Sequence, residues 1–287
     1  MIFLLTVNYN SSHLIQKLIK SLPDPTETPF KLVIINNSSE DVYLNTLEND
    51  FVSIIHSPKN LGFGSACNVG IQSIFGSYRK AIIWLINPDT YIASVNFKEI
   101  IHFFDIYPNI SILGTIIYNI GGKIWFAGGE FIPDRGAILE TDLMSKNNQD
   151  YVLCDWVSGC SLILNLRNFS IPPLFDQKYF LYYEDLDFCQ RYRIQGHLVA
   201  ITSRFSLIHA PSSITNKNQF EKIKHSTFSY FLTLQRYSPV FIQIIFFLKL
   251  FIYAMILLPL KPDIAIGKLV GITNYLNHLK LNKEHLD

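Results

Sequence analysis

The chain of 287 residues is poor in charged side chains and in cysteine, and it has no paired-cysteine motif. Charged residues make up 16% of the chain and leave a net charge of +1. This balance excludes a protein that binds nucleic acid mainly through phosphate contacts. The four cysteines show neither a CxxC pair nor a disulfide-like spacing. We therefore expect buried free thiols in a reducing compartment.

Several well-known motifs are also missing. There is no P-loop, no metalloprotease helix and no Ser-His-Asp elbow, and residues 1–5 lack the basic region and the length of a signal peptide. Gly62-x-Gly64 follows a predicted strand, but Cys67 occupies the third glycine position of a dinucleotide fingerprint. No acidic residue follows at the spacing of the ribose partner, so the sequence disfavours a nicotinamide or flavin enzyme.

Short apolar runs alternate with helical periodicity in the first 90 residues. The runs predict buried strands at residues 2–7, 32–35, 52–56 and 81–86, with helices at 14–22 and 65–75. Alternating strands and helices predict an α/β fold with a mainly parallel, doubly wound sheet. Farther along, the pattern predicts strands at 110–118 and 123–126, a polar loop from about 134 to 150, and a helix at 185–195.

Acidic residues and one histidine stand where such a sheet would bind a ligand. Asn87-Pro88-Asp89 closes the strand 81–86, and ligands of open α/β sheets bind at the carboxyl ends of strands. A second acidic group, residues 184–187, follows the aromatic run 179–183, and His209 ends a later apolar run. A carboxylate and an imidazole can hold a divalent cation, and a further carboxylate can act as a base.

The C-terminal part is different in composition. Residues 240–258 are almost all apolar and lie between Pro239 and Pro259. Their length permits a membrane-spanning helix, but Lys249 would be costly at the middle of a bilayer. The sequence therefore favours a helix that lies in the membrane interface, with a helix packed on the sheet and a full span as the alternatives. We expect one domain at 1–212 and a helical, membrane-associating extension at 213–287.

Over residues 1–212 the chain resembles the inverting glycosyltransferases of family two, which have the GT-A fold, and within them bacterial rhamnosyltransferases. The resemblance depends on an ordered set of motifs: residues 7–10, 35–38, 60–68, Asn87-Pro88-Asp89, 156–160, 175–191 and His209. Asn87-Pro88-Asp89 replaces the more common Asp-x-Asp, and Asn36 stands where the family usually has an aspartate.

The resemblance implies a role for individual residues. The nucleotide sugar would be bound by Thr6, Asn8, Asn36, Asn60, Gly64, Asn87 and Asp89. A divalent metal, Mg²⁺ or Mn²⁺, would be held by Asp89 and His209. Asp185 would be the catalytic base, with Glu184 beside it binding the acceptor and Trp156 forming part of the acceptor wall.

The implied activity is the transfer of a sugar, with rhamnose as a candidate, from a nucleotide-diphosphate sugar to a glycan or lipid-linked glycan in cell-surface polysaccharide synthesis. The enzyme would be cytoplasmic and peripherally attached to the inner face of the plasma membrane. Two other hypotheses stay open at this point. Asn36 and the missing first aspartate favour a nucleotide-sugar-binding protein without catalysis, and the apolar segment 240–258 favours a membrane-anchored interaction protein.

Overall fold

The computed structural model describes residues 1–26, 29–38, 40–92, 95–145, 147–210 and 218–284. The chain forms two compact units. Unit 1 comprises residues 1–130, 139–178 and 185–211, and unit 2 comprises residues 131–138, 179–184 and 212–287. The domain boundary expected at 212/213 lies outside the described residues.

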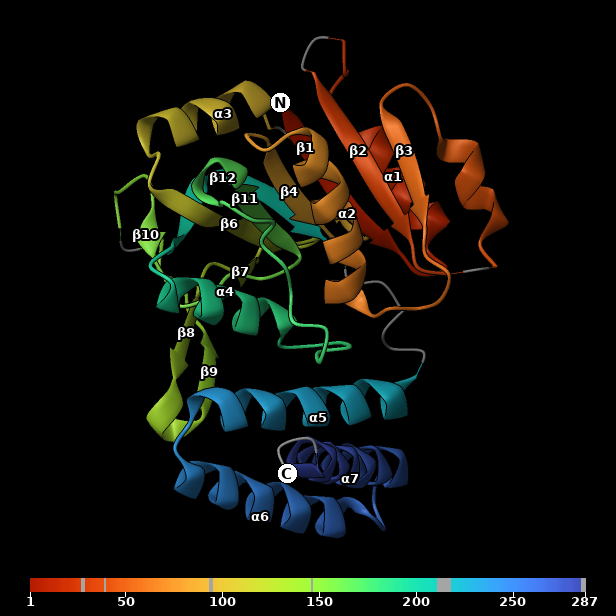
Figure 1. Ribbon diagram of the computed structural model, residues 1–287, viewed down its shortest axis with the longest axis vertical. Helices are drawn as coiled ribbons and strands as arrows, with labels where there is room; N and C mark the ends of the chain where they lie inside the picture. The colour runs from red at the N-terminus through yellow and green to blue at the C-terminus, as the bar shows by residue number, and fades with distance from the viewer. Residues whose placement is uncertain (27–28, 39, 93–94, 146, 211–217, 285–287) are drawn as a thin grey trace. The chain divides into compact units, whose positions relative to one another are not determined.

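Unit 1 is built on one large sheet with the strand order β10-β12-β6-β11-β4-β1-β2-β3 (Figure 1). The strands are β1 (Ile2–Asn8), β2 (Phe30–Asn36), β3 (Val52–His56), β4 (Ile82–Ile86), β6 (Ile110–Asn119), β10 (Val152–Leu153), β11 (Ser161–Asn165) and β12 (Leu198–His209). Two short strands join it: β5 (Thr90–Tyr91) pairs with β12, and β7 (Ile124–Phe126) pairs with β6. The mostly parallel sheet confirms the predicted fold class.

The helices of unit 1 pack around this sheet (Figure 1). They are α1 (Ser12–Ser21), α2 (Phe63–Ser77), α3 (Phe97–Ile106) and α4 (Glu184–Ile194), with the short 3-10 helices η1 (Val42–Leu47) and η3 (Leu166–Asn168). Helix α1 packs in this way because its apolar residues recur at helical spacing, which puts Leu14, Ile15 and Leu18 on one buried side. At the centre of the sheet, the fully buried indole of Trp84 donates a hydrogen bond to Ser161 Oγ at 2.9 Å.

The direction of the strands brings many chain segments to one edge. Strands β1, β2, β3 and β4 run parallel through direct pairing, and β6 is parallel to β12. Because β11 is antiparallel to both β4 and β6, the latter two point the same way. The carboxyl ends of six strands therefore meet the amino end of β11 at one edge of the sheet, which is where ligands of such sheets bind.

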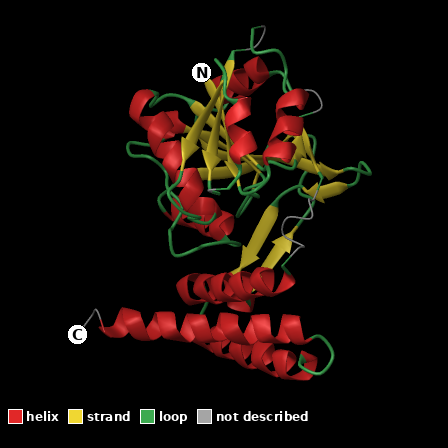
Figure 2. Ribbon diagram, turned by 90° about the vertical axis from the view of Figure 1, so that its right-hand side faces the viewer, coloured by secondary structure: helices red, strands yellow, loops and turns green. Residues whose placement is uncertain are grey.

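Unit 2 is mainly helical and consists of α5 (Gln219–Tyr237), α6 (Val240–Leu257) and α7 (Pro262–Glu284), which contact one another (Figure 2). Its core is a cluster of buried side chains from all three helices: Phe231, Leu234, Ile242, Ile272 and Tyr275. Helices α5 and α7 approach closely at Gly267 and Gly271. A Cβ on Gly271 would lie 2.7 Å from the carbonyl oxygen of Lys224.

One expectation about local structure is wrong. The stretch from about 134 to 150 was predicted to be a loop, but it contains the end of η2 (Pro133–Arg135) and strand β9 (Ala137–Glu140), which pairs with β8 (Gly129–Ile132). The strand was hidden because its sequence, Ala-Ile-Leu-Glu, lacks alternation, and its pairing partner rather than its own pattern makes it a strand. The turn between the strands requires Gly136, whose φ is +57°.

Candidate active site

The turn after β4 and the end of β12 bring Asp89 and His209 together. His209 pairs with Thr90 across β12 and β5, and the backbone N–H of Ala210 donates to the carbonyl oxygen of Asp89 at 2.9 Å. As a result, His209 Nε2 lies 3.3 Å from Asp89 Oδ1. Both side chains are largely buried, with 9% of His209 and 13% of Asp89 exposed. Residues 120 positions apart in sequence thus face each other at the sheet edge.

Asp185 is fixed near the same turn by backbone hydrogen bonds. Its carboxylate accepts from the N–H of Gly159 and from the N–H of Leu186, each at 2.9 Å. Cys160 follows Gly159 in the chain, and its carbonyl oxygen accepts a hydrogen bond from the N–H of Asn87 at 3.3 Å. The residues just before β11 therefore link the carboxylate of Asp185 to the Asn87-Pro88-Asp89 turn.

The pKa of Cys160 shows that Asp89 and Asp185 are both close to it. Burial raises the pKa of the Cys160 thiol well above its usual value, and the charges of Asp89 and Asp185 both raise it further. Burial also raises the pKa of Asp185, although the N–H groups of Gly159 and Leu186 lower it. A carboxylate with a raised pKa is a better proton acceptor once it is ionised. All four cysteines are buried free thiols, as expected.

The other two acids of the group 184–187 have different surroundings. Asp187 is fully buried, and Arg191 Nε donates to its Oδ2 at 2.7 Å. The same guanidinium donates to the carbonyl oxygen of Leu174, so this pair stabilises the fold of unit 1. Glu184 is buried and is the first residue of α4. Its predicted contact with an acceptor stays a prediction.

The ends of β1 and β2 carry a buried polar network. Asn8 Nδ2 donates to Asn36 Oδ1 at 3.0 Å and to Asp41 Oδ2 at 3.1 Å. Asp41 also accepts from the hydroxyl and the N–H of Ser12. Burial raises the pKa of Asp41, but the hydrogen bonds from Ser12 and Asn8 outweigh it and hold the pKa below its usual value. Sequence reasoning missed this carboxylate, five residues after Asn36.

Thr6 lies two residues before Asn8 on β1, and its side chain is 1% exposed. Its hydroxyl has no hydrogen-bond partner within the described residues. Apart from Lys31 near the start of β2, Thr6, Asn8 and Asn36 are the polar residues of these two strands, and they lie toward the carboxyl ends. Their contact with a nucleotide stays a prediction.

The loop before α2 is tied to the end of β2 by Asn37. Its side chain donates to Asn60 Oδ1 at 2.9 Å and accepts from the N–H of Leu61 at 2.8 Å. Asn60 Oδ1 also accepts from the N–H of Gly62, at 2.9 Å. Position 64 has no room for a side chain, because a Cβ on Gly64 would lie 2.9 Å from the Cβ of Phe175. Asn37 belongs to the motif at 35–38, but sequence reasoning assigned it no role; the structure shows that it joins this loop to the end of β2.

A series of ring contacts connects Trp156 through Phe126 and Trp125 to His209. Trp156 is buried at 7% exposure, packs over Gly129, and lies 5.0 Å from the Phe126 ring, centroid to centroid. Trp125 was not predicted as a site residue. Its ring meets the imidazole of His209 edge-on with centroids 4.5 Å apart, and 36% of it is exposed. The pattern of β7 predicted a strand there, but only the pairing with β6 places Trp125 beside β12.

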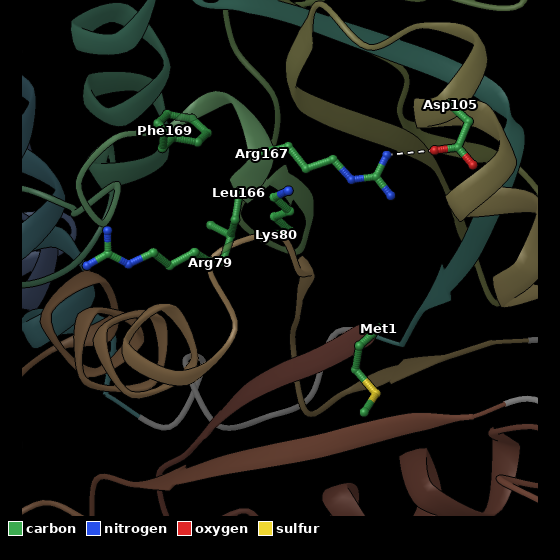
Figure 3. A pocket seen from close by; sticks show the side chains of 7 residues that line it. All are labelled: Met1, Arg79, Lys80, Asp105, Leu166, Arg167 and Phe169. Atoms are coloured by element: carbon green, nitrogen blue, oxygen red, sulfur yellow. Dashed lines mark hydrogen bonds and ion pairs between the residues drawn. The ribbon is translucent and has the colours of Figure 1, made fainter.

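A shallow depression of about 820 Å³ lies elsewhere on unit 1 (Figure 3). Met1 and Lys80 in its lining precede β1 and β4, and Leu166 follows β11, which runs opposite to β4. These positions lie at the amino ends of the parallel strands. The depression is therefore at the opposite edge from Asp89, Asp185 and His209 and is not the predicted donor site.

The residues at the site fit a divalent cation with few protein ligands. Neighbouring ligand atoms of an octahedral ion with bonds of about 2.1 Å lie about 3 Å apart, and Asp89 Oδ1 and His209 Nε2 are 3.3 Å apart. Among the described residues no group of three or more His, Cys, Asp or Glu side chains could hold a metal. The remaining ligands would come from phosphate oxygens and water, as is usual for Mg²⁺.

The mostly parallel sheet and its covering helices have the GT-A fold. The chain belongs to Glycosyl transferase family 2, whose family model matches residues 4–163. The fold agrees with a solved structure, GalNAc-T7 with UDP, GalNAc and Mn²⁺, at a TM-score of 0.58 and 13% identity. That match covers 74% of this chain and 44% of the other.

Curated relatives share more of the chain. Rhamnosyltransferase WbbL of Escherichia coli (strain K12) is 23% identical over 223 residues, covering 73% of this chain and 83% of the relative. N-acetylglucosaminyl-diphospho-decaprenol L-rhamnosyltransferase of Mycobacterium tuberculosis is 21% identical over 257 residues, covering 81% of this chain and 83% of the relative. Both relatives are rhamnosyltransferases by name.

Proposed function

We propose that this glycosyltransferase moves a sugar from a nucleotide-diphosphate sugar to a hydroxyl of a glycan or lipid-linked glycan, with inversion. One observation carries the proposal. The carboxylate of Asp185 is held by two backbone N–H groups next to the turn that bears Asp89, which in turn faces His209. A base and a metal-binding pair supply what the proposed displacement uses: removal of the proton from the acceptor hydroxyl and neutralisation of charge on the departing diphosphate.

The chemistry assigned to Asp185 is proton transfer. As the acceptor oxygen forms its bond to the anomeric carbon, the bond from that carbon to the diphosphate oxygen breaks and the diphosphate leaves with the electron pair. Asp185 takes the proton of the acceptor hydroxyl. A single displacement inverts the configuration. The raised pKa of Asp185 strengthens it as a base, and the two N–H donors fix its orientation.

Asp89 and His209 would hold the divalent metal, which supplies charge neutralisation for the departing diphosphate. Asn87 shapes the turn, because its carbonyl oxygen accepts from the Thr90 hydroxyl at 2.7 Å. The polar ends of β1 and β2 and the loop at Asn60 are assigned to the nucleotide. Asn36 can pair with the edge of a pyrimidine through its amide.

The names of the relatives support the choice of sugar and acceptor. Two curated relatives are rhamnosyltransferases, and one of these acts on a diphospho-decaprenol carrier by its name. We assign a deoxysugar such as rhamnose as the donor sugar and a lipid-linked glycan as the acceptor. We also propose that the enzyme works at the cytoplasmic face of the plasma membrane, where it would meet such an acceptor.

The proposal is tested by a panel of nucleotide sugars in thermal-shift experiments with and without Mn²⁺. A donor that binds the folded state raises the melting temperature by mass action. We expect one donor class to do so, more strongly with Mn²⁺, and Asp89→Asn to abolish the Mn²⁺-dependent part. If no nucleotide sugar shifts the melting temperature under either condition, the donor assignment is wrong.

The stereochemistry is tested separately. With the donor identified, the product is examined by NMR for its anomeric configuration. We expect inversion relative to the donor. A product with retained configuration would contradict Asp185 as the base of a single displacement.

A further inference from the structure

Helix α6 buries one side and exposes the other. Its inward residues recur at spacings of three and four, with Ile242, Ala254 and Leu257 buried and Phe246 and Leu250 packed against the core of unit 2. Only 17% of the helix is buried, although its mean hydropathy is 2.5. One side of α6 therefore packs within unit 2, and the other side is apolar and exposed.

The exposed side of α6 is continuous and apolar. Besides Tyr253, nine large apolar residues of α6 are more than 40% exposed: Val240, Phe241, Ile244, Ile245, Leu248, Phe251, Ile252, Met255 and Ile256. Leu258 and Leu260 extend the surface beyond the helix. We call this set the α6 face. Soluble proteins rarely expose apolar patches of this extent, and such patches mark interaction sites.

Lys249 does not interrupt the α6 face. Its Nζ lies 5.3 Å from the ring centroid of Phe246, a residue of the packed side. The charge is therefore at the border of the apolar surface, where a lysine can reach a lipid headgroup while its carbon chain stays on apolar neighbours. Lys261 follows the α6 face at its C-terminal end.

A membrane-spanning orientation does not fit the packing of α6. The helix contacts α7, whose exposed residues include Thr273, Asn274 and Asn277. A span by α6 would take these polar side chains into the hydrocarbon region, which is costly. A helix that lies in the plane of the interface buries the α6 face and leaves the polar side of α7 in water.

A second copy of the chain is a poorer occupant than a lipid surface. In a two-fold contact through α6, Lys249 would approach its own copy, and α6 has no carboxylate to compensate. Anionic headgroups supply the missing negative charge.

We propose that the α6 face docks in the plane of a bilayer that contains anionic lipid, with Lys249 and Lys261 at the headgroups. The proposed function gives the docking a purpose, since it would bring the enzyme to a lipid-linked acceptor. The docking itself depends only on unit 2, so failure to find a donor sugar leaves it standing.

The test is vesicle flotation of the full-length chain with phosphatidylcholine alone and with phosphatidylcholine plus phosphatidylglycerol. The disrupting variant is Ile244→Asp/Ile252→Asp/Ile256→Asp, at positions 55%, 56% and 59% exposed. The matched control is Ile120→Asp/Ile171→Asp/Ile194→Asp in unit 1, at positions 75%, 73% and 75% exposed. Both variants add three negative charges, so a difference between them reports the α6 face and not net charge.

We expect wild type and control to float with the anionic vesicles and the disrupting variant to stay at the bottom, with all three equally folded by circular dichroism. Lys249→Gln/Lys261→Gln should weaken binding to anionic vesicles by about fivefold per lysine. Equal flotation of the disrupting variant and wild type would overturn the proposal. So would a wild-type chain that binds no vesicles but forms a dimer that the disrupting variant loses.

Discussion

Unit 1 and unit 2 use apolar side chains in opposite ways. In unit 1 every residue of β1 and β4 is buried, and the polar groups at the strand ends pair with one another. In unit 2 the longest apolar segment leaves most of its surface exposed. A sheet covered by helices closes its own core, whereas three helices can bury only part of theirs. Unit 1 thus encloses its apolar residues, whereas unit 2 leaves the α6 face exposed, and we propose that this face contacts a membrane.

The largest effect is expected at the site of unit 1. Asp185→Asn should lower turnover by about 10²-fold to 10⁴-fold, the range for loss of a general base, and should leave donor binding and the fold unchanged. The control is Asp105→Asn, an exposed carboxylate paired with Arg167, which should stay within about twofold of wild type. Turnover of Asp185→Asn close to that of the control would remove Asp185 from its role.

The pH dependence of turnover gives a second measure of the same residue. Burial raises the pKa of Asp185, so the carboxylate becomes protonated and inactive at a higher pH than an ordinary aspartate would. The acid limb of the turnover profile should therefore have its midpoint above the usual pKa of aspartate. A midpoint at or below that value would show that another group limits turnover.

The buried pair of Asp187 and Arg191 tests the stability of unit 1. Asp187→Ala should lower the free energy of unfolding by about 3 kcal/mol, because it leaves a partly buried guanidinium without its carboxylate. Arg191 is 24% exposed, which keeps the loss at the lower end of the range for buried pairs. The exposed pair is the control: Asp105→Ala should cost less than about 1 kcal/mol in denaturant unfolding.

Unit 2 is tested at the contact between α5 and α7. Gly271→Ala should destabilise it by about 1–3 kcal/mol, since the new Cβ would lie 2.7 Å from the Lys224 carbonyl oxygen. Gly76→Ala in α2 is the matched control, because a Cβ there meets nothing within 4 Å. That change should stabilise unit 1 by about 0.5–1 kcal/mol. Limited proteolysis measures the difference: α5 and α7 should be cut faster in Gly271→Ala than in Gly76→Ala. Equal stability of the two variants would contradict close packing of α5 against α7 at Gly271.

The smallest effect concerns the segment that belongs to unit 2 and leads directly into α4. Tyr182 and Tyr183 have φ values of +70° and +62°, a strained backbone for such side chains. Ser229 Oγ donates to the carbonyl oxygen of Leu181 at 2.9 Å and holds this segment. Ser229→Ala removes one hydrogen bond worth about 1 kcal/mol. It should lower turnover about fivefold without changing KM for the donor.

The control for that change is Ser226→Ala on the same helix, which should have normal turnover. If Ser229→Ala also has normal turnover, the strained tyrosines do not set the position of the base. That result would separate the two units further, because turnover in unit 1 would not depend on the packing of unit 2.

Much of unit 1 could be predicted from the sequence, because its strands are continuous apolar runs that end in polar turns. Asn87-Pro88-Asp89 and Asn36 stand at such ends and were found for that reason. Asp41 and Trp125 were missed. Asp41 lies in a segment without period, and its partners Asn8 and Ser12 are about 30 residues away in sequence. Trp125 became a neighbour of His209 only through pairing of β7 with β6.

The sequence by itself determined the strands β1 to β4, β6 and β7 and the apolar character of α6, because both depend on local periodicity and composition. Only the tertiary structure decided which polar residues meet. The antiparallel insertion of β11 sets Gly159 against Asp185, and the pairing of β12 with β5 sets His209 against Asp89. It also decided which side of α6 stays exposed. Strand pairing and helix packing join residues far apart in the chain, and no local pattern contains that information.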